Sequence, residues 1–319
     1  MVVDVHQHLW TPAFVEALRS RTAPPRLAGP RGWTLHLAGE PPYEVDPRDH
    51  DLDRRLRLNA DLALAVVGLS SPLGVEHLPP EDAWPLLDAY HEGAFALPTP
   101  FKAWAATCLS EPDPVRLAAD LDRGAAGLQV PATAVAGPAG LLRVGPLLSV
   151  LEERGLPLFV HPGPAPAQDG GAPWWPALVP YVQQMHAAWH AFHAVGRGRH
   201  PDLRVCFALL AGLAPLHSER LFTRGGGGRG EVDPHVFVET SSYGPRAIDA
   251  VLRELGVDVI VNGSDLPYAT APATGLGPAA DHAVRTANPL RLLGRAAEPT
   301  TPAGIAAGGH IHIRRESRR

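Results

Sequence analysis

The chain has 319 residues, 45% of them hydrophobic, which suits one or two globular domains with a substantial core. A formal net charge of −5 and a pI of about 6.3 argue against nucleic acid as the natural partner. No apolar run reaches membrane-spanning length, and histidines of interest at positions 6 and 8 leave no room for a signal peptide. We therefore expect a cytoplasmic protein with no membrane partner.

The first predicted strand covers residues 2–8 and carries two histidines one residue apart. Residues two apart on a strand project from the same face, so His6 and His8 point together. Two imidazoles on one rigid segment supply half of a divalent-metal site. Two histidines that merely alternate on a strand are an equal alternative until further ligands are found.

Short apolar runs recur along the chain and predict eight strands, at 2–8, 62–70, 101–109, 125–130, 157–161, 203–209, 236–240 and 257–263. Helices are predicted between them at 83–96, 114–123, 141–154, 179–195, 215–222, 245–255 and 281–293. This alternation predicts a single α/β domain over residues 1–294, a (β/α)8 TIM barrel, followed by a flexible tail at 295–319. A doubly wound open sheet is the competing fold, but no Gly-x-Gly-x-x-Gly motif follows the first strand.

Two long loops follow predicted strands 1 and 5, at residues 10–57 and 162–178. In a barrel of this kind the chemistry lies at the carboxyl ends of the strands, where these loops begin. The first loop carries Trp33 and the second carries Trp174 and Trp175. We expect both loops to act as lids that shape a pocket and exclude water.

Two further metal-competent side chains stand at strand ends. His161 closes the fifth predicted strand, and Asp265 follows the eighth. With His6 and His8 they make three histidines and one carboxylate at the same end of the predicted barrel. Their common placement at strand ends favours a metal site over four unrelated polar residues.

These motifs resemble those of the amidohydrolase superfamily, in the branch that includes aminocarboxymuconate-semialdehyde decarboxylase. The resemblance is carried by DVHQHLW at 4–10, FVHPG at 159–163, HPDLRV at 200–205, GSDLPY at 263–268 and ANPLRLL at 287–293. It implies a barrel in which His6, His8, His161 and Asp265 bind one catalytic divalent ion. Zn²⁺ is the first expectation, with Mn²⁺ or Fe²⁺ as alternatives, and the resemblance also suggests a homodimer.

The single lysine supports one metal rather than two. Binuclear members of this superfamily bridge their metals with a carbamylated lysine near the end of strand 4. Lys102 lies instead at the start of the third predicted strand.

The chain departs from the family pattern at the end of the sixth predicted strand. The family places a catalytic histidine there, whereas Leu209 occupies or adjoins that position here, and leucine cannot transfer a proton. Three explanations stay open. His217 replaces the missing histidine, Asp265 acts both as ligand and as proton shuttle, or the protein binds metal and ligand without turnover.

The primary expectation is a metal-dependent hydrolase in which a metal-activated water attacks a small amide, ester or lactone. The alternative is a non-oxidative decarboxylase of a small unsaturated or aromatic acid, and the third is a non-catalytic metal- or ligand-binding barrel. Asp265 and His217 are the expected catalytic residues. The small-molecule substrate is expected to contact Trp10, Trp174, Tyr243 and Arg246.

Overall fold

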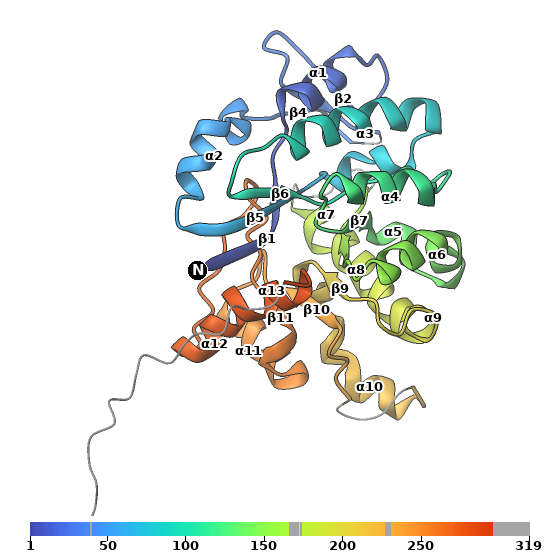
Figure 1. Cartoon of the computed structure of the whole chain (residues 1–319), viewed down its shortest axis with the longest axis vertical. Coiled ribbons are helices and arrows are strands. Elements are labelled where there is room, and N and C mark those ends of the chain that lie inside the picture. The colour runs from blue at the N-terminus through green and yellow to red at the C-terminus, as the bar shows by residue number, and fades with distance from the viewer. Residues whose placement is uncertain (39, 166–171, 173, 227–230, 296–319) are drawn as a thin grey trace, which may run out of the picture.

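The computed structural model describes residues 1–38, 40–165, 172, 174–226 and 231–295. Apart from Arg295, the predicted tail at 295–319 lies outside the described residues. Within them the fold is a mixed α/β structure whose main sheets are parallel (Figure 1). No helix in this part of the chain is long and apolar enough to cross a membrane.

Two parallel sheets form the centre of the molecule. The first has the order β1–β5–β6, with bounds Val2–His8, Leu62–Gly68 and Phe101–Ala103. The second has the order β11–β10–β9–β8–β7, and its strands in chain order are Leu128–Pro131, Leu158–His161, Val205–Phe207, Val236–Glu239 and Ile260–Val261. The predicted strand order is thus observed, although several strands are shorter than expected. The eighth shortens because Val257–Val259 forms a 3-10 turn after Gly256.

Backbone hydrogen bonds connect the two sheets at both seams. Between β6 and β7, the Ala105 N–H donates to the Gly127 carbonyl (2.9 Å) and the Gln129 N–H donates to the Ala105 carbonyl (2.8 Å). Between β1 and the segment after β11, the Val5 N–H donates to the Asn262 carbonyl (3.1 Å). The eight parallel strands therefore succeed one another in chain order, with hydrogen bonds across each seam.

Helices cover the sheets and mostly begin with proline in the first turn, where a missing N–H breaks no helical hydrogen bond. In α4 the Asp113 side chain also caps the first turn by accepting from the Val115 and Arg116 N–H groups. The helices between and after the strands are α3 Pro80–Phe95, α4 Pro114–Asp122, α5 Ala132–Val135, α6 Pro138–Glu153, α7 Trp175–Leu178, α8 Pro180–Ala191, α9 Arg197–Arg199, α10 Ser218–Thr223, α11 Pro245–Leu255, α12 Pro278–His282 and α13 Asn288–Leu292.

The segment after β1 is more structured than the predicted loop. It contains α1 (Pro12–Ser20), α2 (Leu52–Leu58) and a small antiparallel sheet of β2 (Arg26–Ala28), β3 (Thr34–His36) and β4 (Tyr43–Glu44). In Figure 1, α1, β2 and β4 lie at the top of the molecule, and α2 lies below them on the left. It packs on the rest of the fold through a shared core, in which the buried α1 residues Phe14 and Leu18 belong to the same apolar cluster as Leu86 and Leu87 of α3.

A second difference lies after β9, where a helix was predicted at 215–222. The chain instead makes a 3-10 segment over Leu209–His217, followed by α10. Leu209 and the next four residues, through Leu213, all have positive φ, between 46° and 61°. Non-glycine residues seldom adopt this conformation because the Cβ crowds the carbonyl that follows it. The run is buried except for Leu213, which is partly buried, so surrounding packing holds it in place.

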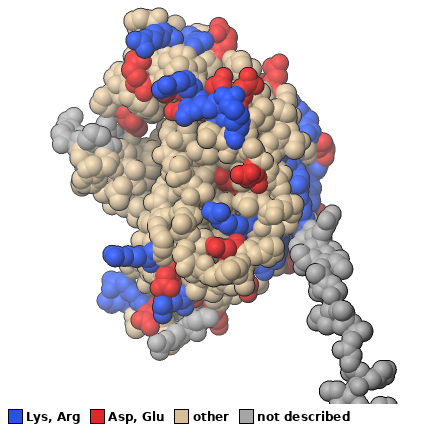
Figure 2. Space-filling view, turned by 90° about the vertical axis from the view of Figure 1, so that its left-hand side faces the viewer, with Lys and Arg blue, Asp and Glu red and all other residues tan. Residues whose placement is uncertain are grey.

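The charged surface mixes both signs. On the face in Figure 2, Lys and Arg side chains are interspersed with Asp and Glu, and the described residues of that face form no extended patch of a single sign.

Candidate metal centre

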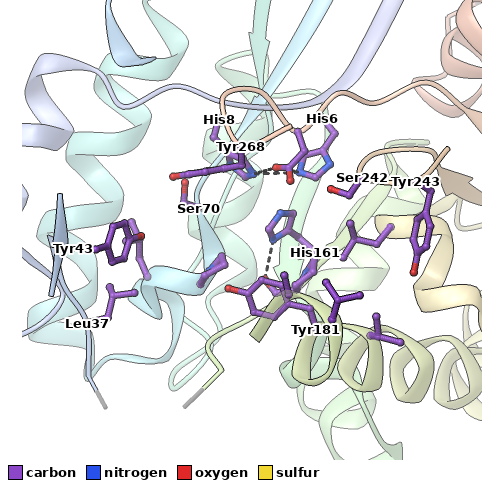
Figure 3. Close-up of a pocket in the computed structure, with 18 residues that line it drawn as sticks. His6, His8, Leu37, Tyr43, Ser70, His161, Tyr181, Ser242, Tyr243 and Tyr268 are labelled. Carbon is purple, nitrogen blue, oxygen red and sulfur yellow. Dashed lines mark hydrogen bonds and ion pairs between the residues drawn. The ribbon is translucent and has the colours of Figure 1, made fainter. Parts of the chain in front are cut away.

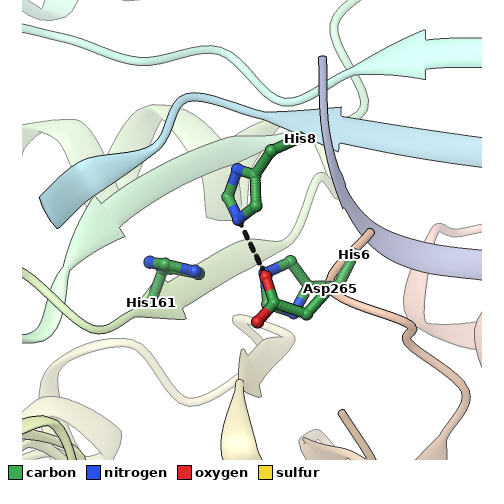
Figure 4. A group of neighbouring side chains, drawn as sticks. All are labelled: His6, His8, His161 and Asp265. Carbon is green, nitrogen blue, oxygen red and sulfur yellow. Dashed lines mark hydrogen bonds and ion pairs between the residues drawn. The ribbon is translucent and has the colours of Figure 1, made fainter. Parts of the chain in front are cut away.

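The side chains of His6, His8, His161 and Asp265 converge on one point (Figure 4). β1 presents the first two on the same face, β8 presents His161 from its last residue, and Asp265 follows β11. One ligand atom from each of the four lies within 4.8 Å of the others. The His6 and His8 Nε2 atoms are 3.2 Å apart and lie 3.4 and 3.2 Å, respectively, from Asp265 Oδ1.

The second ring nitrogen of each histidine has its own hydrogen-bond acceptor. Nδ1 of His6 lies 2.8 Å from Glu239 Oε2, and Nδ1 of His8 lies 3.0 Å from the Gly68 carbonyl. Nδ1 of His161 lies 2.8 Å from the Pro162 carbonyl. Acceptors at these positions assign the proton to Nδ1 and leave the Nε2 lone pairs aimed at the shared point. Three convergent lone pairs and a carboxylate are a donor set that fits a divalent cation.

Charge in the site also fits a cation. Burial lowers the pKa of His8 and, more strongly, of His161, so both rings are neutral donors. Burial lowers the pKa of His6 too, but the nearby Glu239 and Asp265 carboxylates outweigh it and raise that pKa to about 9. Without a cation, these carboxylates therefore favour a second proton on His6, at Nε2, and a bound cation would displace that proton and take over its neutralising role.

Asp4 connects the two segments that carry the ligands. Its Oδ1 accepts from the His6 N–H and from the Ser264 N–H, both at 3.1 Å. Asp265, the next residue, has φ of +59°, which an aspartate tolerates better than most side chains, and its N–H donates to the His6 carbonyl (2.8 Å). Asp265 is thus held against β1 by its own N–H and by the N–H of the preceding Ser264.

A cavity of about 350 Å³ opens onto the four ligands (Figure 3). In Figure 3, Tyr43 and Leu37 stand on one flank and Tyr243 on the other. Most of the lining is apolar or tyrosine, and its residues besides the four ligands are Leu37, Tyr43, Ser70, Pro72, Leu73, Pro162, Ala177, Leu178, Tyr181, Val182, Leu209, Ser242, Tyr243 and Tyr268.

Only one of the five other site residues expected from the sequence lines this cavity, namely Tyr243. Trp10 is buried one layer away, where its Nε1 donates to Ser70 Oγ (3.0 Å). Trp174 and Arg246 are exposed and lie outside the lining. His217 is also exposed, and its ring packs against His186 rather than facing the cavity.

Three tyrosines of the lining were not among the substrate-contacting residues expected from the sequence. Tyr268 stands three residues after Asp265 and could have been inferred from that proximity. Tyr43 and Tyr181 come from β4 and α8, which are distant in sequence, and no spacing or periodicity marks them. Glu239, the partner of His6, follows from its position at the end of β10.

No protein-family model matches the sequence, and no curated protein matches it. Solved structures do match. The chain is similar to IDCase from Metarhizium anisopliae, with a TM-score of 0.71 and 17% identity over 92% of this chain and 97% of that one. It is also similar to 2,6-dihydroxybenzoate decarboxylase from Rhizobium, with a TM-score of 0.65 and 19% identity over 92% and 98%.

A third similar structure is 5-carboxyvanillate decarboxylase from Novosphingobium aromaticivorans, complexed with manganese and a nitrobenzoic acid. Its TM-score is 0.67, with 16% identity over 92% of this chain and 96% of that one. These neighbours share the fold of this chain, so the resemblance inferred from the motifs is confirmed at the level of the fold.

The same structures correct the primary functional expectation. The second and third are decarboxylases by name, which contradicts the expected hydrolase and favours the decarboxylase alternative. Manganese, and not zinc, is the metal named with the third of them.

Proposed function

We propose that the chain is a metal-dependent, non-oxidative decarboxylase of a small aromatic or unsaturated acid. The observation that carries the proposal is the His6–His8–His161–Asp265 cluster at one side of a largely apolar cavity. Hydrogen bonds across both seams support a closed (β/α)8 barrel over residues 1–294, with this cluster at the carboxyl ends of the strands. The likeness to superfamily decarboxylases supports the choice of reaction.

His6, His8, His161 and Asp265 would hold one divalent ion. Imidazole and carboxylate donors suit manganese, iron and zinc alike, and the manganese of one structural neighbour makes that ion the first to test. When bound, the cation supplies positive charge that holds and neutralises the carboxylate of the substrate. Glu239 and the carbonyls of Gly68 and Pro162 orient the three rings for that task.

The substrate would lie with its carboxylate toward the four ligands and its ring in the apolar part of the cavity. The bond between the ring carbon and the carboxylate carbon breaks, carbon dioxide leaves, and the electron pair stays on the ring carbon. That carbon takes a proton from Asp265, which regains one from solvent before the next turnover.

Asp265 is assigned the proton transfer because of its position. It supplies the only carboxyl group among the described residues that line the cavity, and its side chain is partly exposed there. Leu209 lines the cavity near the place where the family carries a histidine, and His217 faces elsewhere. Asp265 therefore combines two roles, ligand and proton donor.

The test is carbon dioxide release from a panel of hydroxylated benzoic acids by the manganese-loaded protein. The variant Asp265→Asn should reduce turnover by roughly 10²- to 10⁴-fold, the usual contribution of a positioned proton donor. Asp249→Asn, an exposed change on α11, is the matched control and should leave turnover unchanged. Tight binding of metal and aromatic acid without any carbon dioxide release would favour a non-catalytic binding protein instead.

A further inference from the structure

The cavity has an unusual balance of charge for a site that binds acids. Among the described residues of its lining there is no lysine or arginine. Arg246, the arginine expected from the sequence to meet a carboxylate, is exposed and outside the lining. Positive charge for an anionic substrate therefore has to come from the metal centre alone.

The tyrosine side chains of the lining carry no charge. Burial raises the pKa of Tyr43 to about 12 and also raises the pKa values of Tyr181 and Tyr243. These phenols are neutral at physiological pH. They can donate hydrogen bonds to neutral oxygen substituents, as can the hydroxyls of Ser70 and Ser242.

Away from the metal ligands the wall is apolar. Leu37, Leu73, Val182 and Leu209 contribute hydrocarbon surface to it. Leu209 is 8% exposed and is held by the left-handed run described above. A charged group placed against these four side chains would lose its water and gain no charged partner, which costs far more than placing a neutral group there.

From this arrangement we infer that the substrate carries a single carboxylate and is otherwise uncharged, with hydroxyl, ether or carbonyl groups as its only polar substituents. The inference rests on the proposed function for the role of the metal centre. It excludes dicarboxylic acids, because no lysine or arginine of the described lining could pair with their second carboxylate.

The experiment compares two ligands of nearly equal size that differ by one charge. 3-Acetylbenzoate and isophthalate are titrated into the manganese-loaded protein at pH 8 by isothermal calorimetry, which measures binding without turnover. We expect 3-acetylbenzoate to bind at least about 30-fold more tightly, which corresponds to about 2 kcal/mol. Equal or tighter binding of isophthalate overturns the inference, and so does failure of both ligands to bind.

A pair of leucine variants tests whether the lack of a cation in the lining causes this selectivity. Leu209→Arg places a cation in the cavity and should shift the affinity ratio at least tenfold toward isophthalate. Leu216→Arg makes the same change at an exposed position outside the lining and should leave the ratio unchanged. Tyr243→Arg introduces the cation at another point of the lining if Leu209→Arg does not fold. A folded, metal-loaded lining variant that keeps the wild-type ratio overturns the inference.

Different results would refute the decarboxylase activity and the single-carboxylate specificity. Selective binding of 3-acetylbenzoate without carbon dioxide release from any aromatic acid would refute the decarboxylase and leave the single-carboxylate specificity intact. If dicarboxylic acids released carbon dioxide as efficiently as monocarboxylic acids, the single-carboxylate specificity would be refuted and the decarboxylase would stand.

Discussion

Replacement of Glu239 by glutamine should weaken metal binding although Glu239 does not contact the metal position. Its carboxylate accepts a hydrogen bond from His6 Nδ1 at 2.8 Å and from Ser241 Oγ at 2.9 Å, and both Glu239 and His6 are buried. The side chain packs closely on Gly263, where an added Cβ would lie 2.4 Å from Glu239 Cγ. A glutamine amide in the same position cannot satisfy all these donors, so His6 loses part of its orientation.

The expected size of the effect follows from the loss of one partner behind a ligand histidine. Such changes weaken metal affinity by about 10- to 100-fold, or about 1.4 to 2.8 kcal/mol. The measurement is competition between the apoprotein and a chromogenic chelator for Mn²⁺ and for Zn²⁺ at fixed pH. Circular dichroism before each titration verifies that the variant is folded.

Glu76→Gln is the matched control. Glu76 is also fully buried, but its partner is Ser71 and it contacts none of the four ligands. Its variant should bind metal within about twofold of the wild-type affinity. If Glu239→Gln retained wild-type affinity, or if both variants lost affinity equally, Glu239 would have no specific role in orienting His6.

Three further outcomes are expected. Burial raises the pKa of Glu76 from 4.5 to about 7, so the folded state binds this proton more tightly than the unfolded state does. The stabilisation from this proton is complete below pH 4.5 and is lost as the pH rises to about 7. Glu76→Gln should therefore raise the unfolding free energy in urea by up to about 3 kcal/mol at pH 8 and by much less at pH 5; an equal gain at both pH values would contradict this. Gly127→Ala should destabilise by about 1–3 kcal/mol, since its Cβ would lie 2.2 Å from the Pro157 carbonyl oxygen, and an unchanged melting temperature would refute the clash. His217→Ala should leave turnover within about twofold, because the ring faces His186, and a large loss would restore His217 as a catalytic candidate.

Sequence patterns were most informative where a side chain's role follows from local periodicity. The two-residue repeat of a strand places His6 and His8 on one face without any knowledge of the fold. The ends of predicted strands identified His161 and Asp265, and the structure brings all four together. The order of the eight strands follows from alternation with helices, which parallel connections require.

Features that depend on contacts between distant segments were not predictable in the same way. Strands β2, β3 and β4 have two or three residues each, and their pairing with one another is not visible in a local pattern. Tyr43 and Tyr181 line the cavity from elements separated by over a hundred residues. The left-handed run at Leu209–Leu213 contradicts the intrinsic preference of its residues, so only the surrounding packing accounts for it.

The seam between β1 and the segment after β11 also constrains how the chain reaches its native state. Ser264 donates to Asp4, and Asp265 donates to His6, so residues about 260 positions apart must meet to complete this edge. Contacts of such sequence separation carry the largest loop-closure entropy and form slowly. During synthesis, β1 leaves the ribosome first but has to wait for its last neighbour until residue 265 has emerged. Until then this edge of β1 is unpaired and can associate with other chains. Expression yield should therefore depend on how far such association is prevented during synthesis.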